Sequence, residues 1–200
     1  MVDSFQPQAD CRIFLSEYPA LLFILRAMKQ FKHNILITLI LLFSSLVTAE
    51  VYQTPEAFLK QTFDARVPEP KVLWISGDVR TRAEQILQHR PDTLRTRYWQ
   101  QGSRTAWILE EIGKERPITV GIVINDESIE TIKVLVFRES RGWEVKYPFF
   151  TNQFKQAELN ADLELNKSID GITGATLSVR ALTKLSRLAL FFHEHVTRTP

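Results

Sequence analysis

Four β-rich runs in the middle of the chain place the strongest constraint on its fold. They cover residues 94–100, 103–112, 118–124 and 129–137, and they are rich in Val, Ile and Trp. Only short polar or glycine-containing links separate them. A parallel connection needs about a dozen residues or more, so links this short can join only antiparallel neighbours. The sequence therefore predicts a central antiparallel sheet.

Helical patterns flank these runs on both sides. Thr54-Pro55-Glu56 opens a short helix, with threonine as the cap and proline at the first position. Asp78 is predicted to cap a second helix that ends near Gln88, and a long amphipathic helix is predicted from Leu177 to about His193. The predicted fold class is α+β, an antiparallel sheet with helices packed on it. The residues expected to face the core from these helices are Phe58, Leu59, Thr62, Phe63, Val79, Ala83, Ile86, Leu87, Ala181, Leu182, Leu185, Leu188, Ala189 and Phe192.

The N-terminal part carries the pattern of a targeting segment. A basic stretch over residues 28–34 precedes a continuous apolar run over residues 35–47, and Val47-Thr48-Ala49 is a small-residue cleavage pattern. This predicts a secretory signal peptide that ends at Ala49, with Met28 as the natural start. The apolar run is shorter than the ~20 residues of a membrane span, so an uncleaved anchor is the weaker alternative. The predicted divisions are 1–49 (upstream extension and signal peptide), 50–93 (helical extension) and 94–200 (main domain).

The composition argues against several kinds of cofactor and ligand. The single cysteine, Cys11, lies before the predicted signal, so the exported chain is expected to form no disulfide, iron–sulfur cluster or c-type haem attachment. Four histidines without a ligand-like cluster predict no metal site, and His193 and His195 are assigned to a fraying C-terminal tail. A net charge of +2 with no basic run gives nucleic-acid binding little support.

The loop Asp170-Gly171-Ile172-Thr173-Gly174-Ala175-Thr176 leads directly into the last helical pattern. Its glycines allow a sharp turn and a close approach to the backbone. Thr173 or a neighbouring hydroxyl is predicted to cap the helix, which places Thr176 in the first turn among unpaired N–H groups that favour a phosphate. Taken alone, a Gly-x-x-Gly before a helix is more often a simple turn.

The full string resembles the flavinylation motif of the FMN-binding domain family, Asp-Gly-x-Ser/Thr-Gly-Ala-Thr. The resemblance covers roughly residues 94–192. It implies that FMN is attached covalently to Thr176 through a phosphoester and that Asp170, Gly171, Ile172, Thr173, Gly174 and Ala175 belong to the cofactor-binding site. It also implies that Asp170 is part of the signature read by a flavin transferase, and that the flavin loop lies at one rim of the sheet.

A second segment resembles the same family. Glu139-Ser140-Arg141-Gly142 is similar to the Glu-Thr-x-Gly stretch that flanks the flavin at a strand end. Ser140 replaces the threonine, and Trp143-Glu144-Val145 replaces the usual glycine-rich continuation. The resemblance implies that Glu139, Ser140 and Gly142 lie beside the flavin loop.

Three functions are compatible with these residues. The first is an exported electron carrier, periplasmic or held on the outer side of the membrane, between a membrane or periplasmic redox partner and a downstream acceptor. The second is a periplasmic flavin-dependent reductase of a small substrate, which would need a concave pocket and an acid–base pair beside the flavin. No such pair stands near the motif, and no catalytic residue is assigned. The third is a flavin-free binding module in which Thr176 only begins a helix.

Overall fold

The computed structural model describes residues 23, 27–32 and 49–198. Most of the predicted signal peptide lies outside these residues. Residues 47–200 group by their contacts into a compact unit separate from residues 1–46. The strands and helices below all belong to that compact unit. No helix among the described residues is both long enough and apolar enough to cross a membrane.

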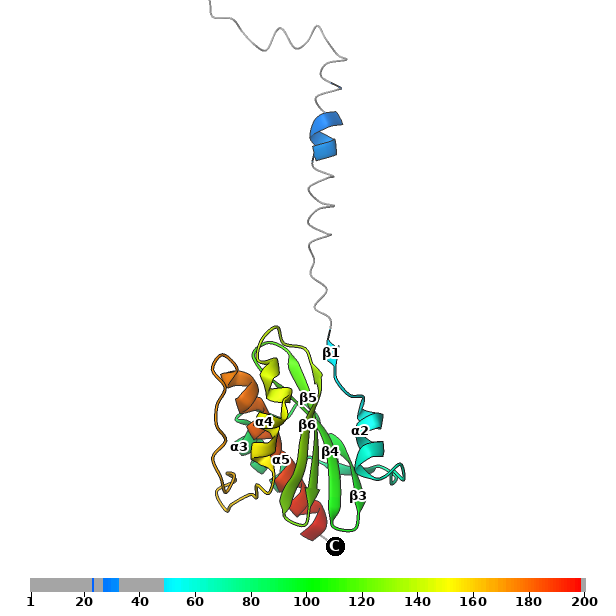
Figure 1. Cartoon of the computed structure of the whole chain (residues 1–200), viewed down its shortest axis with the longest axis vertical. Helices are drawn as coiled ribbons and strands as arrows, with labels where there is room; N and C mark the ends of the chain where they lie inside the picture. Colours follow the sequence, from blue (N-terminus) through cyan, green and yellow to red (C-terminus); the bar gives the residue numbers. More distant parts are fainter. Residues whose placement is uncertain (1–22, 24–26, 33–48, 199–200) are drawn as a thin grey trace, which may run out of the picture. The chain divides into compact units, whose positions relative to one another are not determined.

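A six-stranded antiparallel sheet forms the centre of the fold, in the order β1-β6-β5-β4-β3-β2 (Figure 1). The four predicted strands are present as β3 (Arg95–Gln101), β4 (Arg104–Ile112), β5 (Pro117–Asn125) and β6 (Ser128–Phe137). Two short edge strands, β1 (Glu50–Val51) and β2 (Lys71–Trp74), pair with β6 and β3 respectively. Residues 50–93, predicted as a helical extension, therefore also supply strands to the sheet.

Helices cover both faces of this sheet, so the α+β prediction is confirmed. On one face α3 (Gly77–Leu87) and α5 (Thr176–Arg198) pack against Trp107 and Leu109 of β4 and the apolar residues of β5. On the other face α2 (Pro55–Thr62) packs Phe58 and Leu59 against the opposite side of the sheet. Figure 1 shows α3 and α5 on one side of the strands and α2 on the other. Of the core residues predicted from the helices, all are buried except Thr62, which is half-buried.

The caps of the two N-terminal helices were predicted with mixed success. Thr54 caps α2, because its Oγ1 accepts the N–H of Ala57 at 3.2 Å. Asp78 does not cap α3. Ser76 holds the N-cap position, and Asp78 lies in the first turn, where its negative charge favours the helix N-terminus.

The last helix runs further than predicted, because His193 belongs to the core rather than to a fraying tail. Its side chain is buried. The indole N–H of Trp107 donates to Thr105 Oγ1 at 2.9 Å, and the Thr105 hydroxyl lies 2.8 Å from His193 Nδ1. His193 Nε2 is bonded to the backbone carbonyl of Asp126, which can only accept. The N–H of the neutral ring is therefore on Nε2, and Nδ1 accepts from Thr105. This network joins α5 to β4 and to the turn before β6.

Three short helical turns connect β6 to the loop before α5. They are η1 (Trp143–Lys146), α4 (Pro148–Thr151) and η2 (Asn152–Phe154). Phe150 and Phe154 are fully buried and pack edge to face with ring centroids 5.4 Å apart. This segment after β6 therefore packs two of its aromatic rings into the core. Residues 157–169 form a loop, with one isolated bridge between Leu159 and Leu165.

Candidate functional site: the loop before α5

The motif loop ends in a tight turn directly before α5. The N–H of Ala175 donates to the carbonyl of Ile172 at 2.9 Å, and Gly174 between them has φ +84°, a conformation that side chains rarely adopt. The N–H of Val179 then donates to the Ala175 carbonyl at 2.9 Å and closes the first turn of the helix. α5 begins at Thr176, one residue before the predicted start, so Thr176 lies in the first turn as predicted.

Ala175 holds the N-cap position of α5, so the prediction that Thr173 or another hydroxyl caps the helix is wrong. The reason is the turn at Gly174, which places Thr173 two residues before the cap. Alanine has no side chain that can accept a hydrogen bond. In the described part of the chain, none of the hydrogen bonds uses the N–H groups of Thr176, Leu177 or Ser178. Three donors and the positive end of a long helix are therefore free beside the Thr176 hydroxyl.

The two hydroxyls at the start of α5 differ in accessibility. Thr176 is exposed, whereas the side chain of Ser178 is buried, with a relative exposure of 4% for the residue. Thr173 in the preceding turn is exposed. An acceptor group or an enzyme approaching from solvent can reach Thr173 and Thr176 but not Ser178.

Gly142 brings the segment after β6 against this first turn. A Cβ atom at position 142 would lie 2.6 Å from Ser178 Oγ and 3.4 Å from Ala175 Cβ. The residue also has φ +84°. Only glycine satisfies both conditions, because it lacks the Cβ atom and reaches positive φ without strain. Residues about thirty positions apart in sequence thus meet through one close backbone contact.

Glu139 is bound to a different loop, the turn between β4 and β5. Its Oε1 accepts the backbone N–H groups of Lys114, Glu115 and Arg116, the last two at 2.7 and 2.9 Å. Burial alone would raise the pKa of Glu139, but these three donors outweigh it and hold the pKa below its ordinary value. Gly113 leaves room for the carboxylate, since a Cβ there would lie 2.9 Å from Glu139 Oε1. Glu139 therefore fixes the geometry of the strand end.

The remaining predicted site residues are mostly exposed. Asp170 is exposed and does not cap a helix; its backbone N–H donates to Gln153 Oε1 at 2.8 Å. Ile172 is half-buried and packs on the core, whereas Gly171, Thr173 and Ser140 are exposed. Sequence reasoning did not assign roles here to Gln153, which holds the loop at Asp170, or to Ser178, which packs under Gly142. Neither residue belongs to a recognisable motif.

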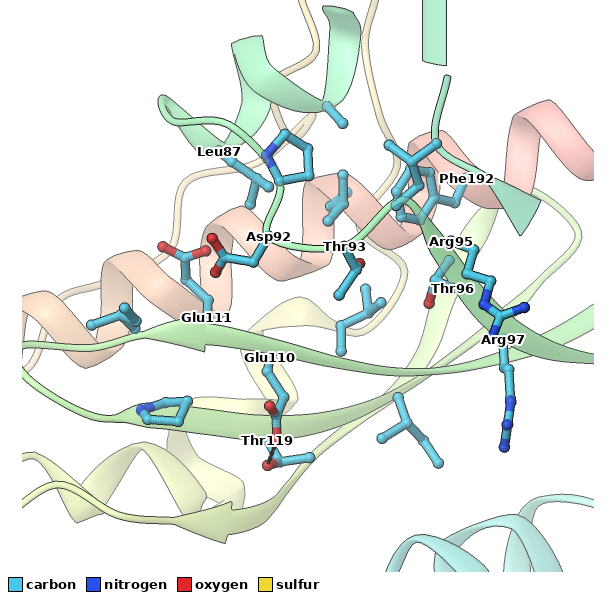
Figure 2. A pocket seen from close by; sticks show the side chains of 18 of the residues that line it. Leu87, Asp92, Thr93, Arg95, Thr96, Arg97, Glu110, Glu111, Thr119 and Phe192 are labelled. Carbon is cyan, nitrogen blue, oxygen red and sulfur yellow. Dashed lines mark hydrogen bonds between the residues drawn. The ribbon is translucent and has the colours of Figure 1, made fainter. Parts of the chain in front are cut away.

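A cavity of about 720 Å³ lies elsewhere, where β3 and β4 separate (Figure 2). β3 pairs with β4 only from Tyr98 to Gln101, whereas β4 pairs with β5 along its whole length. Residues 95–97 and 108–112 therefore diverge, and Asp92, Thr93 and Glu111 lie at the gap, whereas Glu110 points to the other side of β4, toward Thr119. The residues that line this cavity include none of positions 139–142 or 170–176. The cavity is distinct from the motif loop.

The comparisons with known proteins agree with the motif. Residues 113–190 match the family model described as the FMN-binding domain. This part of the chain is therefore similar to FMN-binding domains. The match includes Glu139, Gly142 and the whole motif loop, so the resemblance read from the sequence is confirmed, and FMN is supported as the cofactor.

One solved structure with a similar fold is a component of the Na⁺-translocating NADH-quinone reductase from Parabacteroides distasonis. It is 18% identical to this chain, with a TM-score of 0.44, and the alignment covers 66% of this chain and 81% of that one. No curated protein matches.

The described residues offer no alternative centre for a metal. No group of three or more His, Cys, Asp or Glu side chains suited to a metal ion occurs in residues 23, 27–32 and 49–198. The motif loop itself presents a hydroxyl beside free backbone donors, a combination that fits a phosphate ester.

Proposed function

We propose that this chain is an exported electron-transfer protein that carries FMN covalently on Thr176. The observation that carries the proposal is the exposed Thr176 hydroxyl at the first position of α5, beside three unpaired N–H groups. These donors and the helix dipole favour the negative charge of a phosphodiester. The phosphate of FMN fits this position, and the flavin supplies one- and two-electron chemistry when bound.

The protein's own residues hold and position the phosphate. Attachment forms a bond between Thr176 Oγ and phosphorus and breaks the P–O bond to the leaving group of the flavin donor that the transferase supplies. The leaving group takes the hydroxyl proton, so the chain gains the mass of one FMN less one water. Gly174 shapes the turn that exposes the hydroxyl, and Gly142 lets the strand end approach the first turn of α5. Arg180, exposed one turn further along α5, is positioned in sequence to add a positive charge. Asp170 and residues 171–175 are the signature proposed to be read by a flavin transferase.

The surroundings of the motif favour a carrier over a reductase. A reductase of a small substrate requires a concave pocket next to the flavin, with polar groups that converge on the reacting atoms. The 720 Å³ cavity is lined by residues outside the motif, and the loop itself is largely exposed. An exposed cofactor suits exchange of electrons with a partner protein, which we propose to be a membrane or periplasmic redox protein.

Export follows from the sequence pattern and is part of the same proposal. The basic segment, the apolar run and the Val-Thr-Ala site predict a mature protein that begins at Glu50 and lies in the periplasm or on the outer side of the membrane. A covalent link prevents loss of the cofactor by dilution in that compartment. N-terminal sequencing of protein from the cell envelope tests this step.

The attachment site is tested by co-producing the protein with a flavin transferase and measuring the mass and flavin fluorescence of the denatured chain. We expect an adduct of one FMN less water in the parent and no adduct in Thr176→Ala. Thr173→Ala is the comparison variant, because Thr173 is also an exposed hydroxyl of the loop. It is expected to carry an adduct on Thr176, at reduced yield because Thr173 belongs to the signature proposed to be read by the transferase. A flavin that remains on Thr176→Ala would overturn the assignment.

A further inference from the structure

An exposed aromatic patch surrounds Lys146 at the β1 edge of the sheet. It consists of Tyr52, Trp143, Tyr147 and Phe149. The Lys146 Nζ atom lies 3.9 Å from the ring centroid of Tyr52 and 5.3 Å from those of Trp143 and Tyr147. Tyr147 in turn contacts Trp143 edge to face and stacks on Phe149. The relative exposures of Trp143, Tyr147 and Phe149 are 42, 41 and 62%, so the patch is large and open.

The patch adjoins the motif loop. Trp143 directly follows Gly142. A Cβ atom on Gly142 would contact Ser178 and Ala175, so the backbone at Gly142 packs against the start of α5. Leu177, next to Thr176, is also exposed. A surface that covers the patch would therefore lie close to the residue that carries the proposed flavin.

The charge beside the patch is positive. A groove of about 440 Å³ next to it is lined by Lys133, Lys146 and Lys155, and none of its lining residues is an Asp or Glu. The nearest acid that pairs with this set is Glu50, 3.7 Å from Lys146. Aromatic rings together with lysines are the side chains that favour the interface of an anionic bilayer.

The choice of occupant rests on the side chains of the patch and the groove. Glu50 accepts a hydrogen bond from the Tyr52 hydroxyl and lies 3.7 Å from Lys146, so one acid offsets part of the positive charge. Lys133 and Lys155 line the same groove, and the exposed rings of Trp143, Tyr147 and Phe149 lie beside it. This combination of rings and lysines favours an anionic lipid surface as the occupant.

We propose that the aromatic patch is a peripheral membrane-binding surface that rests on anionic lipid. Phe149, Trp143 and Tyr147 insert at the level of the headgroups, and Lys133, Lys146 and Lys155 face the lipid phosphates. The binding itself is independent of flavin. Its consequence, that the cofactor on Thr176 is held near membrane redox proteins, rests on the proposed function.

Co-sedimentation with lipid vesicles tests this surface. The chain from Glu50 to Pro200 contains the whole compact unit, and Thr176→Ala keeps it free of flavin. It is mixed with vesicles of equal parts phosphatidylglycerol and phosphatidylcholine, and with vesicles of phosphatidylcholine alone. We expect binding to the anionic vesicles, weaker binding to the neutral ones, and at least about tenfold weaker partitioning of Trp143→Ser/Phe149→Ser.

Trp74→Ser is the matched control. Trp74 is 60% exposed and lies on β2, at the opposite edge of the sheet from β1. It is expected to partition like the parent. Phe149→Ser alone, at the most exposed ring of the patch, is expected to weaken partitioning as well. Thermal unfolding of each variant shows whether it folds, which separates a lost surface from a lost fold.

The outcomes separate this proposal from the proposed function. No binding of the parent to anionic vesicles, or equal losses in the Trp74 and Trp143/Phe149 variants, would overturn the membrane surface. Binding to native membranes but not to pure lipid would also overturn it, in favour of a protein partner. Flavin loading is measured separately, on the chain with its native Thr176. The chain can therefore bind vesicles without being flavinylated, or be flavinylated without binding vesicles.

Discussion

Gly142→Ala is expected to destabilise the fold because two separate effects act at this position. The first is backbone strain, since φ is +84° and an L-residue there costs about 1–2 kcal/mol. The second is overpacking, since the new Cβ would lie 2.6 Å from the buried Ser178 Oγ, and such crowding costs about 1–3 kcal/mol. The free energy of unfolding should therefore fall by roughly 2–5 kcal/mol.

Gly174 supplies a control with the same backbone angle. Its φ is also +84°, but a Cβ there meets no atom within 4 Å. Gly174→Ala should therefore show only the cost of strain, about 1–2 kcal/mol. The difference between the two variants measures the contact between the strand end and the first turn of α5.

The assay is urea unfolding followed by circular dichroism, with a double-mutant cycle in a Ser178→Ala background. Removing Oγ leaves only Ala175 Cβ at 3.4 Å and Ser178 Cβ at 3.4 Å near the new methyl group. Part of the loss should then be recovered. If Gly142→Ala costs no more than Gly174→Ala, or if Ser178→Ala recovers nothing, the argument that Gly142 is required by close packing is refuted.

Two further predictions concern groups whose pKa values are shifted. Burial lowers the pKa of His193 in the folded protein, so the unfolded chain takes up a proton first as the pH falls. The free energy of unfolding should therefore decrease below about pH 6.5. His193→Gln should lose this dependence on pH, which chemical unfolding at several pH values measures. A parent whose slope equals that of His193→Gln would contradict the neutral network. Glu139→Ala removes the acceptor of three N–H groups and should destabilise the β4–β5 turn by about 2 kcal/mol. The difference between parent and variant should become smaller in acid, because the Glu139 carboxylate of the parent then takes up a proton. Hydrogen exchange of residues 114–116 measures it, and unchanged protection of these amides would contradict it.

The sheet and the core were predictable because their signals are local and redundant. Short links dictated antiparallel pairing, and the apolar spacing in α3 and α5 identified the buried faces correctly. The edge strands β1 and β2 were missed as strands. A two-residue strand has no periodicity, and β2 presents a mostly exposed pattern that only its pairing with β3 defines.

The motif loop could be located from its sequence, but its neighbours could not be worked out in the same way. The approach of Gly142 to Ser178 depends on the path of η1, and the bond of Glu139 to residues 114–116 depends on sheet geometry. His193 was misjudged because a histidine near a chain end has no sequence signal for a partner such as Thr105, 88 positions away. These contacts arise only when distant segments pack together.

The measurement that tests the central claim most directly is the intact mass of the protein recovered from the cell envelope after co-production with a flavin transferase. The account predicts a chain that begins at Glu50 and carries one FMN less water, with the adduct on the peptide that contains Thr176 and absent from Thr176→Ala. A chain with no adduct in the presence of an active transferase, or with the adduct on Thr173, would contradict it.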